Sequence, residues 1–274
     1  MSNHKLNVIS RTSDNPDPHK PPVLLVHGAW HAAWCWEDNF LDFFANHGFQ
    51  THAIDLRGHG ASDAVTSMRW NRVSGYVEDV MSVVDTFETP PFVIGHSMGG
   101  YIGQHLLRRT DRLSGIGLLA TVPSFGVYKT VLQMIMQRPF DFAWANLSLS
   151  LYPLVKDPMA AKRMFFDDDL SNETAIDWAG KLTDASYLGF LDMLFLNIPM
   201  GRKYDVPTMV VAGGKDKLFA PATQLHTANK LDAAYEVVAD ASHDIMLSQH
   251  WEQAAQHFLR WMNETRNTQN STLS

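Results

Sequence analysis

Pro91-Phe92-Val93-Ile94-Gly95-His96-Ser97-Met98-Gly99-Gly100 is the stretch that decides the fold. The apolar run before Gly95 is typical of a buried strand, and an amphipathic helical pattern begins directly after Gly100. Gly95 and Gly99 stand where a side chain would clash if the backbone reversed from strand to helix over so few residues. The sequence therefore predicts that Ser97 lies on this turn, beside the free N–H groups at the start of a helix.

Apolar runs alternate with helical patterns over most of the chain, and this alternation implies a parallel sheet. We expect strands at residues 23–26, 50–55, 92–94, 115–120, 208–212 and 235–239, with an edge strand at 5–10. Between about residues 125 and 199 the alternation stops. Five helical stretches are expected there, at 127–137, 140–147, 158–166, 172–181 and 187–195. Because ligands bind at the carboxyl ends of parallel strands, we interpret this insertion as a lid or cap.

Composition limits the classes of function. The 274 residues suffice for one large α/β domain with an insertion. A net charge of −7 without clustered Lys and Arg argues against nucleic acid. We expect no membrane span, because no stretch reaches the roughly 18 apolar residues that a bilayer requires. We expect a cytoplasmic protein, because Met1 to Lys20 is polar where a signal peptide has an apolar centre.

The sequence predicts neither a metal nor a cofactor. Cys35 is the single cysteine, which excludes an internal disulfide and a cysteine-based zinc site. The run Asp167-Asp168-Asp169 has no histidine cluster near it in the sequence, so we interpret it as a solvent-exposed helix boundary.

A serine hydroxyl needs a base to remove its proton, and the base needs an acid to orient it. In this architecture the order along the chain is serine, acid, histidine, with both partners on loops at the carboxyl ends of strands. Asp216 follows one apolar run in a glycine-containing turn, and His243 follows the last such run. No acid follows the expected strand at 115–120, and Asp240 is only a fallback. The sequence therefore predicts Ser97 as nucleophile, His243 as base and Asp216 as the orienting acid.

Acyl transfer also needs hydrogen-bond donors for the developing oxyanion. The backbone N–H of Met98 directly follows the nucleophile and is the first candidate. The second should come from the loop after the first core strand, where Ala29 N–H is our choice and Trp30 N–H the alternative. We expect His27 to hold this loop by hydrogen bonding.

Apolar side chains stand beside the predicted catalytic loops and in the methionine-rich insertion, which favours an apolar substrate. The predicted substrate-binding residues are Trp30, Phe125, Met134, Leu218 and Ile245.

The motifs at 23–30, 55–62, 95–100, 213–216 and 242–243 together resemble the α/β-hydrolase superfamily over about residues 20–262. The resemblance implies an α/β fold with a mostly parallel eight-stranded sheet flanked by helices. Its core would comprise residues 1–124 and 200–264, with an inserted helical cap at 125–199. The polar segment 265–274 is expected to be a disordered tail.

The resemblance further implies a serine hydrolase that works through an acyl-enzyme, as carboxylesterases and small lipases do. We expect hydrolysis of carboxylic esters of small-to-medium apolar substrates. The His27–His31 loop also resembles the plant esterase and hydroxynitrile lyase branch, but that branch's cap lysine has no clear match here.

Two alternatives remain open. One is a cofactor-independent dioxygenase of a heteroaromatic ring, although the known members carry their acid after the strand that corresponds to 115–120. The other is a receptor-like protein that binds a small molecule. A C–C bond hydrolase or an amidase would use the same three residues. Dehalogenases and epoxide hydrolases of this fold need a carboxylate where this chain has Ser97.

Overall fold

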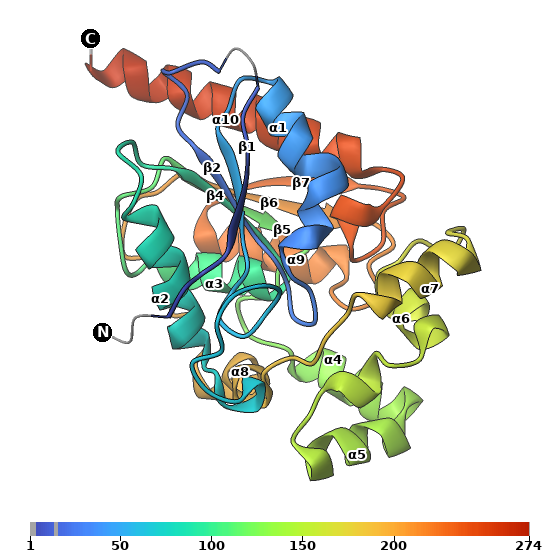
Figure 1. Ribbon diagram of the computed structural model, residues 1–274. Coiled ribbons are helices and arrows are strands. Elements are labelled where there is room, and N and C mark those ends of the chain that lie inside the picture. The colour runs from blue at the N-terminus through green and yellow to red at the C-terminus, as the bar shows by residue number, and fades with distance from the viewer. Residues whose placement is uncertain (1–3, 14–15, 274) are drawn as a thin grey trace.

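The computed structural model describes residues 4–13 and 16–273, which form one sheet in the order β1-β3-β2-β4-β5-β6-β7 (Figure 1). Strand β1 pairs antiparallel with β3, and all other neighbours are parallel. The strands are β1 (Val8–Arg11), β2 (Val23–Val26), β3 (Thr51–Ile54), β4 (Phe92–His96), β5 (Gly115–Leu119), β6 (Thr208–Gly213) and β7 (Ala234–Val238).

Each expected strand is present, but the expected total of eight was wrong for the described residues, where the sheet has seven strands. The reason lies before β2. Among the described residues of this segment only β1 forms a strand, and Pro16, Pro18, Pro21 and Pro22 stand between it and β2. Proline has no N–H for a strand ladder, so the segment does not form a second antiparallel strand.

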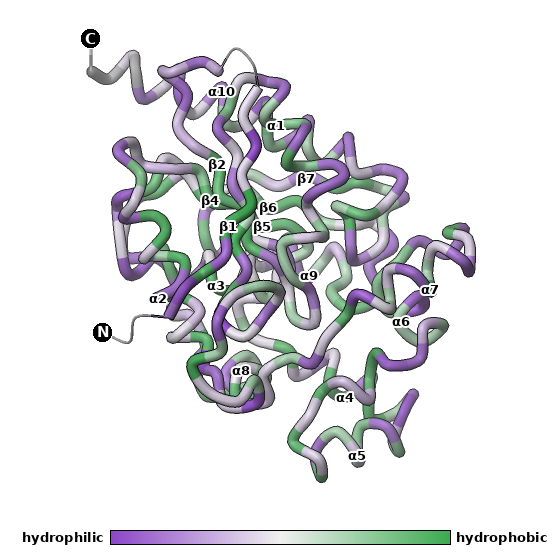
Figure 2. The backbone as a smooth tube through the Cα atoms, viewed as in Figure 1, coloured by the Kyte–Doolittle hydropathy of each residue, from purple (hydrophilic) through white to green (hydrophobic). Residues whose placement is uncertain are grey.

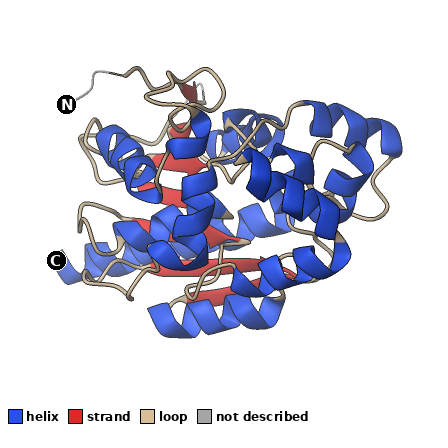
Figure 3. Cartoon of the chain, turned by 90° about the horizontal axis from the view of Figure 1, so that it is seen from below, coloured by secondary structure: helices blue, strands red, loops and turns tan. Residues whose placement is uncertain are grey.

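Helices cover both faces of the sheet (Figure 3). In β5, Ile116 faces Gly103 of α3, while the adjacent position, Gly117, faces Phe258 of α10. Since neighbouring residues of a strand point to opposite faces, α3 and α10 lie on opposite faces of the sheet. Strands β2, β4 and β5 are buried along their whole length, and hydrophobic residues follow the central strands in Figure 2.

The helices outside the insertion are mostly short. The segment between β2 and β3 consists of η1 (Ala33–Trp36), η2 (Glu37–Leu41) and α1 (Asp42–Asn46), a 3₁₀, a π and an α segment in succession. The others are η3 (Met68–Trp70), α2 (Val73–Val84), α3 (Met98–Leu106), α9 (Pro221–Leu231), η6 (Ile245–Leu247) and α10 (Trp251–Leu273). No helix of the described residues combines the length and the apolarity needed to cross a membrane.

All five helical stretches expected between β5 and β6 are present. They lie together beyond one end of the sheet in Figure 1 and are called the helical insertion, residues 128–196. Its elements are α4 (Tyr128–Gln137), α5 (Pro139–Ser148), η4 (Tyr152–Leu154), α6 (Pro158–Phe165), α7 (Asn172–Gly180), α8 (Tyr187–Leu191) and the π-helix η5 (Asp192–Leu196).

The end of the chain differs from expectation. Helix α10 runs to Leu273, so residues 265–273 are helical where we expected disorder, and Ser274 lies outside the described residues. Contacts with the core account for this extension. Thr265 is buried, and the side chains of Arg266 and Gln269 donate hydrogen bonds to the carbonyl oxygens of His19 (3.3 Å) and Ser114 (3.4 Å).

The turn between β4 and α3 is as tight as its sequence predicts. Ser97 has φ of 52° and ψ of −111°, a left-handed backbone conformation that is uncommon outside glycine. A Cβ atom on Gly95 would lie 2.2 Å from Gly99 O, and one on Gly99 would lie 2.2 Å from Val26 O. Both obstacles are backbone atoms, so the reversal depends on these two glycines.

We predict that Gly95→Ala lowers the free energy of unfolding by about 3 kcal/mol or more, because the new methyl group meets backbone that cannot move aside. Gly180→Ala is the matched control, since nothing lies within 4 Å of its added Cβ. Its effect should stay within about 1 kcal/mol. Urea unfolding of both variants measures the difference, and a wild-type midpoint for Gly95→Ala would contradict the proposed clash.

Candidate active site

The structure brings together the predicted acid and base. Asp216 follows β6, His243 follows β7, and His243 Nδ1 donates to Asp216 Oδ2 at 2.8 Å. The other carboxylate oxygen accepts the backbone N–H groups of Leu218 (2.8 Å) and Phe219 (2.9 Å). Both side chains of the pair are buried. The carboxylate therefore has a fixed orientation and holds the His243 ring with Nδ1 protonated, which leaves Nε2 as the proton acceptor.

Charge around His243 raises its pKa above the usual value. Burial by itself lowers the pKa of this imidazole, but the Asp216 carboxylate outweighs burial through its charge and its hydrogen bond, and Asp244 adds to the rise. The ring can therefore accept a proton although it is buried.

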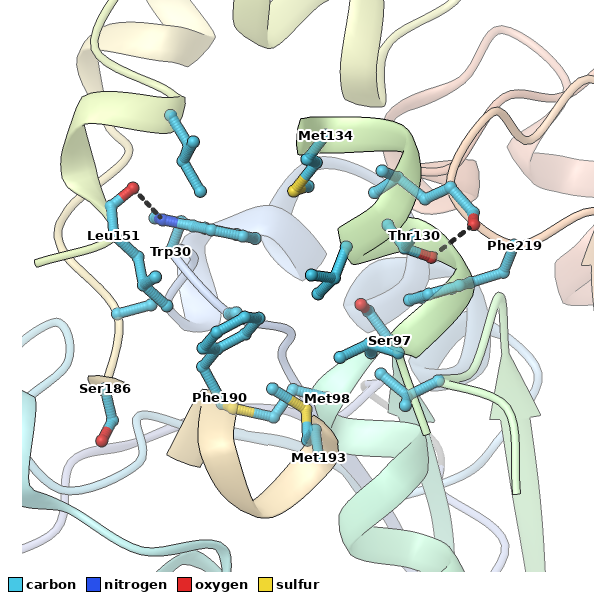
Figure 4. A pocket seen from close by; sticks show the side chains of 17 residues that line it. Trp30, Ser97, Met98, Thr130, Met134, Leu151, Ser186, Phe190, Met193 and Phe219 are labelled. Carbon is cyan, nitrogen blue, oxygen red and sulfur yellow. Dashed lines mark hydrogen bonds between the residues drawn. The ribbon is translucent and has the colours of Figure 1, made fainter. Parts of the chain in front are cut away.

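Ser97 lies at the carboxyl end of β4, the same edge of the sheet from which Asp216 and His243 emerge. Its side chain does not cap α3, and Figure 4 shows its hydroxyl directed into a pocket. The neighbouring residue His96 joins this turn to the next loop, because His96 Nε2 donates to His243 O (3.1 Å) and the two rings lie 4.9 Å apart. The structure records no hydrogen bond between the Ser97 and His243 side chains. In unliganded enzymes such bonds are often long.

The loop after β2 and the start of α3 carry the candidate oxyanion donors. Ala29, Trp30 and Met98 all line the pocket, and no acceptor is recorded within the described residues for their backbone N–H groups. Trp30 has a φ of 64°, so the loop bends sharply here. As expected, His27 holds this loop: its Nδ1 donates to Gly28 O (2.8 Å), and its Nε2 accepts from the Leu56 N–H (3.1 Å).

A second histidine–carboxylate pair lies beneath the first and was not predicted. His31 Nδ1 donates to Ala29 O (2.8 Å), and His31 Nε2 donates to Asp244 Oδ2 (2.9 Å). Burial raises the pKa of Asp244, but His31 and the other nearby imidazoles outweigh it and lower this pKa. The pair thus connects the Ala29 loop to the residue that follows His243.

His96, His243 and Asp244 bring potential metal-ligand atoms within 4.8 Å of one another. Three bonds already engage this cluster: Asp216 holds His243 Nδ1, His31 holds Asp244 Oδ2, and His96 Nε2 donates to a backbone oxygen. The three residues therefore act as a hydrogen-bonded network in this structure.

Asp167 corrects our interpretation of the triple-aspartate run. Asp168 is exposed as expected, but Asp167 is buried. Its carboxylate accepts the backbone N–H of Ser242 (2.9 Å) and the hydroxyl of Ser248 (2.6 Å). Asp167 thereby fixes the loop around His243 from the helical insertion. These partners lie more than 70 residues away along the chain, so local sequence gave no signal of this role.

The pocket above Ser97 is almost entirely apolar (Figure 4). Of the predicted substrate-binding residues, Trp30, Met134 and Leu218 line it, but Phe125 and Ile245 do not. Phe125 packs instead against His226 (ring centroids 5.5 Å apart), and Ile245 is fully buried in the core. Residues that we did not predict also line the pocket: Val122, Val127, Thr130, Val131, Leu151, Leu154, Ala185, Ser186, Phe190, Met193 and Phe219.

Comparisons with known proteins show the family to which the chain belongs. The family model described as "Alpha/beta hydrolase family" matches residues 23–257, so the chain belongs to the α/β-hydrolase family. "Uncharacterized carboxylesterase nap" of Bacillus subtilis (strain 168) is 23% identical over 242 residues, which cover 84% of this chain and 75% of that protein.

"Putative methylesterase 15, chloroplastic" of Arabidopsis thaliana is 37% identical over 79 residues, and the match spans 28% of this chain and only 17% of that protein. Among solved structures, the putative non-heme bromoperoxidase BpoC of Mycobacterium tuberculosis H37Rv superimposes with a TM-score of 0.73 at 20% identity. This match covers 95% of this chain and 96% of that one.

Burial of neutral histidines predicts a loss of stability in mild acid. Burial lowers the pKa of His59 to about 4, of His96 to about 3 and of His105 to about 4. Below the usual pKa of about 6.5, the unfolded chain binds protons that these folded imidazoles do not, so the free energy of unfolding falls as the pH falls. The raised pKa of His243 makes the free energy of unfolding change with pH in the opposite direction, but this is one group against three.

Urea unfolding at pH 7.0 and pH 5.5 should therefore show a clearly lower midpoint at pH 5.5. Each of the three imidazoles contributes about 1.4 kcal/mol per pH unit below 6.5. His105→Gln, which removes one of them, should reduce the pH dependence by about that amount. Equal wild-type midpoints at the two pH values would contradict the assignment of buried neutral rings.

Proposed function

We propose that this protein is a serine esterase that cleaves carboxylic esters of small-to-medium apolar substrates through an acyl-enzyme. The observation that carries the proposal is the buried Asp216–His243 pair at the sheet edge that bears Ser97, under an apolar pocket. Membership of a hydrolase family and the carboxylesterase name of a relative support the same reading.

In the first half-reaction, Ser97 Oγ attacks the ester carbonyl while His243 Nε2 takes its proton. The Asp216 carboxylate stabilises the imidazolium that forms, and the backbone N–H groups of Met98 and Ala29 stabilise the oxyanion. Trp30 N–H is the alternative second donor. The intermediate collapses, and the alkoxide leaves with the proton from His243. Water, activated by the same ring, then hydrolyses the acyl-enzyme and restores Ser97.

The oxyanion assignment rests on the unused backbone donors. Ala29 and Met98 are buried, and their N–H groups have no recorded acceptor within the described residues. Buried N–H groups rarely lack a partner, so a vacant pair beside a nucleophile suits an oxyanion that is present only during the reaction.

The helical insertion would act as a cap over this site, within the boundaries 125–199 expected from the sequence. Trp30 Nε1 donates to Leu151 O (3.3 Å) and so joins the oxyanion loop to the insertion. The free space above Ser97 is about 50 Å³. Ligand pockets measure roughly 300–1,000 Å³, so substrate entry requires Met134, Met193 or the whole insertion to move.

The dioxygenase alternative is less well supported. Its known members carry the acid after the strand that corresponds to β5, but His243 takes its carboxylate from the loop after β6. The receptor-like alternative predicts binding without turnover, and the first experiment below separates it from an esterase.

Ser97→Ala should lower kcat/KM by about ten-thousand-fold or more on p-nitrophenyl esters from acetate to octanoate, because it removes the nucleophile. The control is Ser82→Ala on α2, outside the pocket lining, which should keep wild-type rates. Substrate hydrolysis that is unaffected by Ser97→Ala, or no hydrolysis of any ester, would overturn the esterase proposal.

Asp216→Asn should reduce kcat by roughly ten-thousand-fold and also move the pH–rate profile. The wild-type rate rises with pH as His243 loses its proton, with a midpoint above the ordinary imidazole value because Asp216 raises that pKa. Without this charge, burial dominates and the midpoint moves to lower pH.

The matched control is Asp240→Asn. Asp240 is the fallback acid of the sequence analysis, and its carboxylate is half exposed and paired with Lys215 (2.7 Å). It should keep both the rate and the midpoint. A profile that shifts with Asp240→Asn but not with Asp216→Asn would reverse the two roles.

A further inference from the structure

A second cavity adjoins the apolar pocket and differs from it in character. It measures about 450 Å³ and lies between α4, α6 and the loop after β6. The lining residues are Thr130, Gln133, Met134, Gln137, Arg138, Ala160, Arg163, Met164, Lys217 and Leu218. We call this cavity the cationic groove. Thr130, Met134 and Leu218 line both cavities, so the two share part of their walls.

The charged side chains that line the groove are all cationic, although each has an aspartate partner outside the lining. Arg138, Arg163 and Lys217 line it together with two glutamines, and its lining contains no aspartate or glutamate. The whole chain has a net charge of −7. Positive charge concentrated in a concave site attracts anions, and guanidinium groups suit carboxylate and phosphate oxygens in particular.

Two of these cations can exchange their present partners at little cost. The Arg163 side chain is 68% exposed, and its nearest recorded carboxylate, Asp157, lies 3.9 Å away. Lys217 pairs with exposed Asp168 at 2.5 Å. Exposed ion pairs of this kind contribute little to stability, so both cations are available to an anion in the groove.

The third cation is held in place. Arg138 bonds to Asp141 (3.0 Å) and to the carbonyl oxygen of Leu154, which fixes its guanidinium at the edge of the groove. A fixed donor loses less conformational entropy when it binds a ligand than a mobile one does.

Thr130, Met134 and Leu218 form the wall that the two cavities share. Thr130 Oγ1 donates to Leu218 O (3.0 Å), a bond drawn in Figure 4, and Met134 lies about one turn further along the same helix. Met134 is an unbranched side chain that can change rotamer readily. A flexible chain could therefore pass from the space above Ser97 into the groove without disturbing the sheet.

We infer that the natural substrate is an ester with an apolar segment that ends in an anionic group, a carboxylate or a phosphate. The apolar segment occupies the pocket above Ser97, and the anion binds Arg163 and Lys217 in the groove. This inference rests on the proposed esterase function and narrows it to anionic esters, of which half-esters of dicarboxylic acids are the simplest.

The kinetic test compares p-nitrophenyl monoesters of dicarboxylic acids, from glutarate to sebacate, with p-nitrophenyl esters of monocarboxylic acids of equal chain length. The wild type should prefer the anionic member by about tenfold or more in kcat/KM at the chain length that spans both cavities. A second pair, the hexanoyl esters of 4-hydroxybenzoate and of neutral 4-hydroxybenzamide, places the anion in the alcohol part of the ester. A preference for the benzoate ester would show that the groove binds an anion of the alcohol part.

Arg163→Gln combined with Lys217→Gln should remove the preference and leave the rates on neutral esters within about twofold of wild type. Arg109→Gln is the matched control, because Arg109 is exposed on the core and outside both cavities. Arg109→Gln should keep the preference for anionic esters. Added salt should weaken this preference in the proteins that retain the groove cations.

Binding to Ser97→Ala protein, measured by calorimetry with the same ester pairs, keeps the test independent of turnover. The anionic esters should bind about tenfold more tightly, and the groove double substitution in that background should abolish the difference. Equal affinity and equal rates for anionic and neutral esters would overturn the groove assignment while the esterase function stands. If no ester is hydrolysed but anionic esters still bind more tightly, the esterase function is overturned and the anion-binding role of the groove stands.

Discussion

The hydrogen bond between Asp216 Oδ2 and His243 Nδ1 is the interaction on which the rest of the site depends. Parallel strands place the ends of β4, β6 and β7 at one edge of the sheet, so residues far apart in sequence meet there. The other carboxylate oxygen of Asp216 accepts hydrogen bonds from N–H groups of its own loop, and the His243 ring packs against the rings of His96 and Phe219. The ring is therefore oriented before any substrate arrives.

Close packing and buried hydrogen bonds hold this arrangement in place. The left-handed backbone of Ser97 is held by close packing between β2, β4 and α3, where two glycines leave room for backbone alone. The His31–Asp244 pair ties the Ala29 loop to His243, and His96 ties the Ser97 turn to it. Buried hydrogen bonds thus fix three loops to one another and make the site rigid. The helical insertion, by contrast, packs over the pocket through flexible methionines and aromatic rings.

The sequence could predict those features of the fold and the candidate site that depend on short local patterns. The Ser97 turn, Asp216 and His243 each follow an apolar strand, and chain order then selects among many acids and histidines. The missed features depend on contacts across the fold: Asp167 reaches the His243 loop from the insertion, and Asp244 finds His31 over 200 residues away. Phe125 and Ile245 stand near predicted catalytic residues in sequence, but Phe125 packs against His226 and Ile245 lies in the core, because the direction of a side chain depends on packing across the fold. The total of eight strands came from the resemblance alone and was wrong for the described residues, and contacts of Arg266 and Gln269 order a segment that we expected to be disordered.

The central claim is that one serine, Ser97, is activated by the Asp216–His243 pair. The most direct measurement is the intact mass of the protein after reaction with a fluorophosphonate, followed by peptide mapping of the modified site. The account predicts a single adduct on Ser97, and labelling that slows as the pH falls and His243 takes up a proton. No adduct, or an adduct on another residue with Ser97 unmodified, would contradict it.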